Sequence, residues 1–279
     1  MARSDDFTFG IEIETHMPMG SVDVGSHGCG RQVEWLPTGW LADRDPSIAA
    51  PSGRLKCEFV SPVLRGVEGL RQALDAVREI KERGGKINPS CGLHIHVGFD
   101  KRDTAALGRL INLVAAHEGG LFAITGSKSR EQGTGSASIY STHWCKSIKQ
   151  YGSVRGFAIR SRDRYHCLNV ATDKPTVEFR VFGSTLNVTK IAAYVRVCVG
   201  LCQKALDSKR NACFTSKSKG PLTRIGRQGQ AEMNRMFQSL RWNRPDRMLG
   251  DIVADDLPSM QSTRKELRRL SMKYDGVTE

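Results

Sequence analysis

Three short segments of the chain place ionisable residues two apart with an apolar residue between them, and this alternation constrains the fold more than any other feature. The segments are residues 7–15, 93–97 and 176–182, and their ionisable pairs are Glu12/Glu14, His94/His96 and Glu178/Arg180. Successive side chains of a strand point to opposite faces of a sheet, so each pair lies on one face and the intervening apolar residue on the other. The pattern predicts strands with one apolar face and one charged face.

These charged positions have an ordinary explanation, because the outer faces of amphipathic strands are often polar. Glu is depleted in strands, however, and His seldom fills a solvent face, so three such pairs in one chain favour a site. Glu58, in the segment 56–62, adds a further carboxylate. If these strands are neighbours, several carboxylates and an imidazole converge, and their mutual repulsion requires a cation. Oxygen-rich ligation with one imidazole suits Mg²⁺ or Mn²⁺ better than zinc.

Helical periodicity separates the predicted strands. Apolar residues recur at helical spacing over residues 67–80, from Thr104 to Val114 with Thr104 as the expected cap, and over residues 189–206. Residues 33–41 predict a hairpin, and residues 56–61 predict a further strand. Because strands and helices are interspersed without a regular strand–helix–strand repeat, we predict the α+β class with a mainly antiparallel sheet.

The composition bounds the size and class of the protein. The 279 residues are 39% hydrophobic and 25% charged, which is ordinary for a globular protein that buries a core. This length favours one large domain, or one domain plus an appendage. We see no apolar run of about 18 residues and no signal peptide, and the cysteines are scattered as reduced thiols usually are. We therefore expect a cytoplasmic protein without a membrane span.

The chain carries a formal net charge of +13, and much of the excess lies in its last quarter. Such an excess fits nucleic acid binding through phosphates, and it fits an enzyme for anionic substrates equally well. A charge run is most often simply a solvated face. The basic residues of the last quarter include Arg224, Arg227, Arg235, Arg241, Arg244, Arg247, Arg264, Lys265, Arg268 and Arg269.

A metal cluster beside Arg180 has the elements that phosphoryl transfer needs. Divalent ions bridge the phosphate oxygens, and a guanidinium balances the charge that develops on the transferred group. The sequence holds no Walker-type phosphate loop between a strand and a helix. Any nucleotide would therefore be bound chiefly through metals and basic side chains.

Four blocks of sequence follow one another in a distinctive order. They are Phe9-Gly-Ile-Glu-Ile-Glu14, then Asp45-Pro-Ser47 with Glu58-Phe-Val-Ser-Pro62, then Cys91-Gly-Leu-His-Ile-His-Val-Gly98, and finally Thr176-Val-Glu-Phe-Arg-Val-Phe-Gly-Ser-Thr185. Together the blocks resemble the amidoligases, which are carboxylate–amine ligases of the glutamine synthetase fold related to the glutamate–cysteine ligases. Four ordered blocks are far more specific than any one of them.

The resemblance implies a curved, mainly antiparallel sheet of the glutamine synthetase catalytic-domain type with packed helices. It also implies ATP-dependent formation of an amide or peptide-like bond through an acyl phosphate, with two or three Mg²⁺ or Mn²⁺ ions. The partners would be small-molecule or peptide carboxylates and amines. The resemblance does not reach residues 207–279, so we expect a catalytic domain over residues 1–206 and a basic, helical C-terminal extension over residues 207–279.

The resemblance implies metal-binding roles for five residues. Glu12, His94 and Glu178 would bind the metal that bridges the nucleotide phosphates. Glu14 and Glu58 would hold the metal nearer the substrate carboxylate.

Four further residues complete the expected site. By the same resemblance, Arg180 would stabilise the transferring phosphoryl group, His96 would contact the nucleotide phosphates, and Asp45 would orient or deprotonate the amine. Arg164 precedes the Glu178 strand in an arginine-rich segment. We expect Arg164 to meet phosphate or a substrate carboxylate, with a solvated loop as the alternative.

Two other functions stay open. A metal-dependent phosphoesterase or nuclease would use the ions to activate water and the basic tail to grip nucleic acid, and it would not require ATP. A basic nucleic-acid-binding protein without catalysis would tolerate Glu12→Ala and Glu178→Ala, but would fail when Arg264, Arg268 and Arg269 are reversed in charge.

Overall fold

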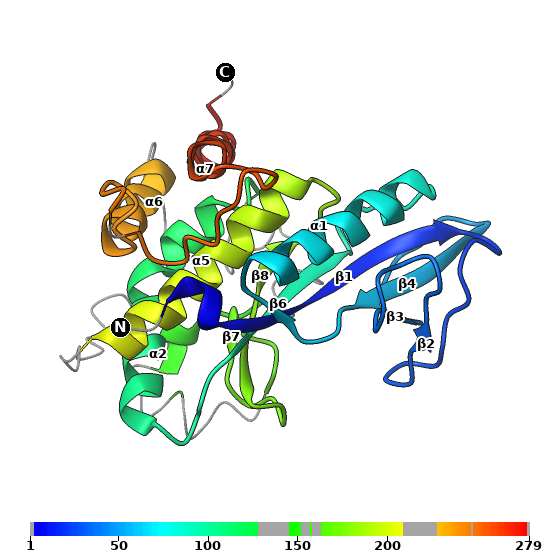
Figure 1. Ribbon diagram of the computed structural model, residues 1–279, viewed down its shortest axis with the longest axis horizontal. Helices are drawn as coiled ribbons and strands as arrows, with labels where there is room; N and C mark the ends of the chain where they lie inside the picture. The colour runs from blue at the N-terminus through cyan, green and yellow to red at the C-terminus, as the bar shows by residue number, and fades with distance from the viewer. Residues whose placement is uncertain are drawn as a thin grey trace.

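The computed structural model describes residues 3–127, 145–151, 157, 163–208, 228–246 and 248–277. In these residues strands and helices are interspersed along the chain (Figure 1). The strands are β1 (Thr8–Pro18), β2 (Arg31–Gln32), β3 (Leu41–Asp43), β4 (Arg54–Val60), β5 (Leu64–Arg65), β6 (Gly92–Gly98), β7 (Leu168–Asn169) and β8 (Thr176–Gly183). The helices are α1 (Gly66–Glu82), α2 (Thr104–Ala123), α5 (Val188–Asp207), α6 (Gln228–Ser239) and α7 (Met260–Tyr274), with short 3₁₀ turns at Ser4–Asp6 and Ile148–Tyr151.

The strands form one sheet in the order β2-β3-β4-β1-β6-β8-β7, and β5 pairs with β1 beside β4. The pairings between these strands are all antiparallel, so the predicted α+β class with a mainly antiparallel sheet is confirmed. A hairpin is present, but its paired strands are β2 and β3, and most of the predicted segment 33–41 forms the connection between them. The central strand β1 lies between β4 and β6, so it joins segments that are far apart in the sequence.

One face of the sheet is apolar and carries the core. The side chains of Ile13, Ile95 and Phe179, which separate the ionisable pairs, are fully buried. Helices α1 and α5 lie along the sheet (Figure 1). The ring of Phe182 in β8 stacks on Tyr194 of α5, with centroids 4.2 Å apart and planes 15° apart. The apolar half of each predicted strand therefore packs beneath helices.

A β-bulge interrupts the strict alternation of side chains between the two faces that was predicted for β8. Leu93 lies opposite Phe182, whereas Ile95 lies opposite Phe179, so β8 carries one extra residue between the two pairs. Strict alternation would place Phe182 on the same face as Glu178. The extra residue instead turns Phe182 to the apolar face, and bulges of this kind commonly re-aim side chains next to active sites.

The C-terminal helices α6 and α7 belong to the same hydrophobic core as the sheet. The core includes Met233 and Phe237 of α6 and Leu267 and Leu270 of α7. The helical character expected for the region after residue 206 is thus present in α6 and α7, while residues 209–227, with Arg224 and Arg227, lie outside the described residues. The division into domains 1–206 and 207–279 stays a prediction.

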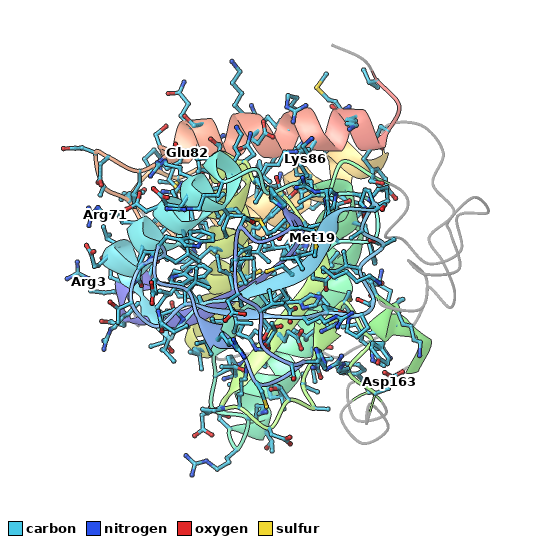
Figure 2. The ribbon with its side chains drawn as sticks, turned by 90° about the vertical axis from the view of Figure 1, so that its right-hand side faces the viewer. Arg3, Met19, Arg71, Glu82, Lys86 and Asp163 are labelled. Atoms are coloured by element: carbon cyan, nitrogen blue, oxygen red, sulfur yellow. The ribbon has the colours of Figure 1, made fainter. Side chains whose placement is uncertain are left out.

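Surface ion pairs tie α1 to the segment before α7. Arg71 on α1 donates Nε to Asp256 Oδ2 at 2.5 Å and Nη2 to Asp256 Oδ1 at 3.0 Å. Figure 2 shows Arg71 at the outer edge of the molecule, where water screens such a pair and limits its contribution to stability.

Among the residues the structure describes, no helix is long and apolar enough to span a membrane. The cytoplasmic location stays a prediction.

The N-terminal cap of α2 differs from the expectation. Thr104 is the first residue of the helix, and the cap is Asp103, whose Oδ1 accepts a hydrogen bond from Ala106 N at 2.8 Å. A side-chain acceptor at the cap satisfies one of the backbone N–H groups that the first turn leaves unpaired. The Asp103→Ala variant should lower the free energy of unfolding by about 1 kcal/mol. Urea titration followed by circular dichroism measures this, and Thr104→Ala should have a smaller effect.

Candidate active site

The strand register gathers the predicted site residues on the polar face of the sheet. Glu14 lies opposite Glu58, and Glu12 lies opposite His94. On the next strand, Glu178 lies opposite His96. Directly opposed residues of antiparallel strands have side chains on one face, with Cβ atoms about 4.5–5.5 Å apart. Four strands that are distant in the sequence therefore contribute to one cluster.

His94 lies at the centre of this cluster. Its Nδ1 is 3.2 Å from Glu12 Oε2, 3.7 Å from Glu178 Oε1 and 3.9 Å from Glu58 Oε1. Its Nε2 is 3.5 Å from Glu14 Oε1. One imidazole on β6 thus lies within 4 Å of carboxylates from β1, β4 and β8.

Glu12 also meets two further basic groups at the open side of the cluster. Its Oε1 lies 3.1 Å from His96 Nε2 and 3.5 Å from Lys174 Nζ. His96 Nδ1 is 3.2 Å from Thr176 Oγ1, and this contact helps to orient the ring. Lys174 is in the segment before β8 and its side chain is 60% exposed, so its ammonium reaches the site from solvent.

Glu178 and Arg180 form a buried ion pair at the β8 side of the cluster. Arg180 Nη1 donates to Glu178 Oε1 at 2.5 Å, and both side chains are buried. The other oxygen of Glu178 accepts from Asn169 Nδ2 of β7 at 2.6 Å. Arg180 Nε is also buried and has no hydrogen-bond partner among the described residues. Arg180 therefore has one buried N–H donor beside the carboxylates that no described residue uses.

The surroundings of Glu58 raise the pKa of its carboxyl. Burial raises the pKa of the Glu58 carboxyl, and the charges of Glu12, Glu14, Asp45 and Asp43 raise this pKa further, well above its usual range. Like charges in a buried site favour the neutral acid unless a cation enters. A divalent ion would restore the carboxylate form of Glu58.

The pKa values of Glu12 and Glu178 are instead lowered. Burial acts to raise the pKa of Glu12, but hydrogen bonds and charges from His94 and His96 outweigh it and hold this pKa well below its usual value. Burial also opposes ionisation of Glu178, yet the charges of His94, Arg180 and His96 lower its pKa. These two carboxylates are therefore ionised, and so able to bind a cation, at neutral pH.

Two groups of donor atoms could each hold a metal ion. Glu12, His94 and Glu178 form one group, and Glu14, Glu58 and His94 form the other. Within each group the donor atoms lie within 4.8 Å of one another. Carboxylate oxygens with an imidazole nitrogen are a suitable donor set for Mg²⁺ or Mn²⁺. Because both groups use His94, the residues present fit a divalent ion in either group, and their role as metal ligands stays a prediction.

The remaining predicted residues differ in how close they lie to this cluster. Asp45 is buried and accepts from Ser47 N at 2.7 Å, and its charge acts on Glu58. Arg164 is exposed, and its guanidinium lies 5.4 Å from the centre of the Tyr165 ring, with no ion pair to the cluster among the described residues. The structure therefore places Asp45 beside the cluster and Arg164 at its periphery. Arg160 and Arg162 lie outside the described residues.

Three residues near the cluster were not assigned a role from the sequence. Asp43 lies opposite Glu58 at the end of β3, Asn169 lies opposite Glu178 on β7, and Lys174 reaches Glu12. Strands β3 and β7 are too short, at three and two residues, to show a periodic signal. Only the pairing of these strands with β4 and β8 reveals which face their side chains share.

Comparison with known proteins identifies the class. The profile of the family described as "Putative amidoligase enzyme" matches residues 25–134 and 132–202, which is more than half of the chain. The chain belongs to this family. The predicted resemblance is therefore confirmed.

Two solved structures resemble the chain at low sequence identity. One is a bifunctional glutathione synthetase from Pasteurella multocida, with 10% identity and a TM-score of 0.46 over 97% of this chain and 48% of that chain. Another is the ligase PafA in complex with the prokaryotic ubiquitin-like protein Pup, with 11% identity and a TM-score of 0.42 over 98% of this chain and 65% of that chain. The chain thus spans about half the length of the first and 65% of the second. No curated protein matches the sequence.

Proposed function

We propose that this protein is an ATP-dependent carboxylate–amine ligase that forms an amide or peptide-like bond through an acyl phosphate, on a sheet of the glutamine synthetase catalytic-domain type. Membership of the amidoligase family supports this chemistry. The observation that carries the proposal is the pair of three-ligand groups that share His94 next to the buried Arg180–Glu178 ion pair. Divalent ions beside a guanidinium are the elements that phosphoryl transfer requires.

The metal-binding residues divide between two ions. Glu12, His94 and Glu178 would hold the ion at the nucleotide phosphates, and Glu14 and Glu58 would hold the ion nearer the substrate carboxylate. When bound, the ions would orient the phosphate and carboxylate oxygens and offset their charge. Without them, the repulsion among these carboxylates would work against binding of an anionic substrate.

The reaction would proceed in two displacements. An oxygen of the substrate carboxylate attacks the γ-phosphorus of ATP, the bond to the bridging oxygen breaks, and ADP leaves. Arg180 would stabilise the transferring phosphoryl group, and its Nε, which has no partner within the described ranges, is a donor suited to a phosphoryl oxygen. His96 and Arg164 would contact the nucleotide phosphates. The amine then attacks the acyl carbon, Asp45 accepts its proton, and phosphate leaves as the amide forms.

A reconstituted assay tests this function. The protein with Mg²⁺, ATP and pooled carboxylates and amines should release phosphate only when both substrate pools are present, and mass spectrometry should detect the amide. Phosphate release by Arg180→Ala at the wild-type rate would contradict the proposal. Hydrolysis of a model phosphodiester without ATP would instead indicate a phosphoesterase or nuclease. Nucleic acid binding that survives Glu12→Ala and Glu178→Ala, with no amide formed, would indicate a binding protein.

Removal of divalent ions is expected to abolish amide formation, and Mg²⁺ or Mn²⁺ should restore it. An ion that binds only the native state also stabilises it, by about 2.7 kcal/mol at 100 times its Kd. The thermal midpoint should therefore rise when Mg²⁺ is added to chelator-treated protein. Glu14→Gln combined with Glu58→Gln should reduce this rise, because one donor group is lost. An unchanged midpoint in the wild type would argue against the metal centre.

A further inference from the structure

The charges of the candidate active site are distributed unevenly across the sheet. At the β8 side, Arg180 pairs with Glu178, and Lys174 lies 3.5 Å from Glu12. At the β3–β4 side stand the carboxylates of Glu14, Glu58, Asp43 and Asp45. Within the described ranges, no Lys or Arg lies within ion-pair distance of these four carboxylates, and the imidazole of His94 is the one basic group that reaches Glu14 and Glu58. The basic side suits phosphates, and the acidic side suits a cation.

Asp43 is a buried carboxylate of this acidic side. The residue is only 8% exposed, and its position opposite Glu58 puts its side chain on the polar face of the sheet. Asp43 Oδ2 accepts from Gly28 N at 3.3 Å. Asp43 Oδ1 is buried without a hydrogen-bond partner among the described residues. A buried carboxylate oxygen left without a donor is unfavourable unless a ligand supplies one.

The candidate metal centre does not use Asp43. Among the described residues, two groups of donors lie close enough to share an ion. Both groups contain His94, and neither contains Asp43 or Asp45. A divalent ion held by Glu14 and Glu58 would offset the charge of these two carboxylates. Asp43 and Asp45 then lie at the edge of the site with no Lys or Arg of the described part of the chain within ion-pair distance.

We propose that Asp43 and Asp45 together recognise an amine substrate that carries a second positive charge, which is a diamine or a polyamine-like group. This inference rests on the proposed ligase function. Asp45 keeps its role at the reacting amine, and Asp43 binds the ammonium that does not react. A monoamine with an apolar tail is disfavoured, because it leaves Asp43 Oδ1 buried without a donor among the described residues.

Calorimetry with matched amines tests the proposal on the full chain. The protein with Mg²⁺ and a non-hydrolysable ATP analogue is titrated with cadaverine and with pentylamine, which differ by one terminal amino group. The wild type should bind cadaverine at least about tenfold more tightly, since truncation of one partner of a buried charge pair typically has an effect of this size or larger. Asp43→Asn should abolish that preference. Asp23→Asn, an exposed acidic residue of the same segment that pairs with Arg31, is the matched control and should retain it.

Several outcomes would overturn the proposal. Equal binding of cadaverine and pentylamine by the wild type would do so, and this comparison does not depend on whether a variant folds. A cadaverine preference that persists in Asp43→Asn would do so as well. Weaker Mg²⁺ binding by Asp43→Asn, with the preference intact, would assign Asp43 to a metal instead. Failure of the proposed function can be distinguished from failure of this inference. If the proposed function is wrong, the wild type forms no amide with any amine in the presence of ATP. If only this inference is wrong, the wild type forms amides but shows no preference for diamines.

Discussion

Replacing Glu178 with Gln is expected to lower the rate of amide formation by about a thousandfold. Glu178 contributes to a candidate metal group and is also the counter-ion of Arg180, to which it is joined at 2.5 Å. The amide keeps the volume and can still accept from one of the two donors, Arg180 or Asn169, so the variant should fold. It lacks the negative charge that would hold the ion and that balances the guanidinium. A loss of several kcal/mol of transition-state stabilisation corresponds to about a thousandfold in rate.

The measurement is kcat/KM for ATP at saturating carboxylate and amine, together with Mn²⁺ affinity from paramagnetic resonance. Both should fall in Glu178→Gln. The control is Glu68→Gln on α1, whose side chain is 81% exposed and pairs only with Arg71 at the surface among the described residues. This control should stay within about twofold of the wild type, because surface ion pairs contribute little. Wild-type turnover by Glu178→Gln would remove β8 from the proposed metal centre.

Replacing Arg196 with Ala is expected to lower the free energy of unfolding by about 3–5 kcal/mol. Arg196 of α5 is fully buried, and burial lowers its pKa to about 10, so it stays cationic at neutral pH. Its Nε and Nη2 donate to Ile252 O at 3.0 and 2.7 Å, and its Nη1 donates to Thr263 Oγ1 at 2.5 Å. The truncation leaves a cavity and deprives buried acceptors of their donors, and both effects destabilise.

Urea titration at several protein concentrations measures this loss. An unchanged slope of the unfolding free energy against urea concentration would show that wild type and variant unfold in comparable transitions. Arg268→Ala is the matched control, because Arg268 is an exposed arginine on α7. It should change the free energy of unfolding by less than about 0.5 kcal/mol. A small effect of Arg196→Ala would mean that the segment around Ile252 is not held to α5 by this side chain.

Much of the candidate site could be predicted from local sequence, because alternation in a strand is a strong and local signal. The pairs Glu12/Glu14 and His94/His96 share a face in the structure as their spacing requires. The helices α1 and α5 follow the apolar periodicity within one or two residues of the predicted ends. Family membership was also visible in the ordered blocks, since they lie on the strands that build the polar face.

Other features could not be predicted, because they arise from contacts between distant segments. Asp43 and Asn169 are on strands too short to show a pattern, and only their partners β4 and β8 place them. One exception is local: the cap of α2 is Asp103 rather than Thr104, and both residue types are favourable at a cap. The bulge in β8 depends on how β6 pairs with it, and it turns Phe182 to the core while Arg180 stays beside Glu178.

The sequence alone determined which residue types could bind a metal or phosphate, and that the pairs Glu12/Glu14 and His94/His96 each share one strand face, because these properties depend on residue type and on the two-residue period of a strand. The tertiary structure decided the order of the strands. The order β3-β4-β1-β6-β8 brings Glu58 and Glu178 to the same His94 and leaves Asp43 on the side without Lys or Arg partners among the described residues. Strand order follows from burial of the whole apolar face beneath the helices, which no single segment encodes.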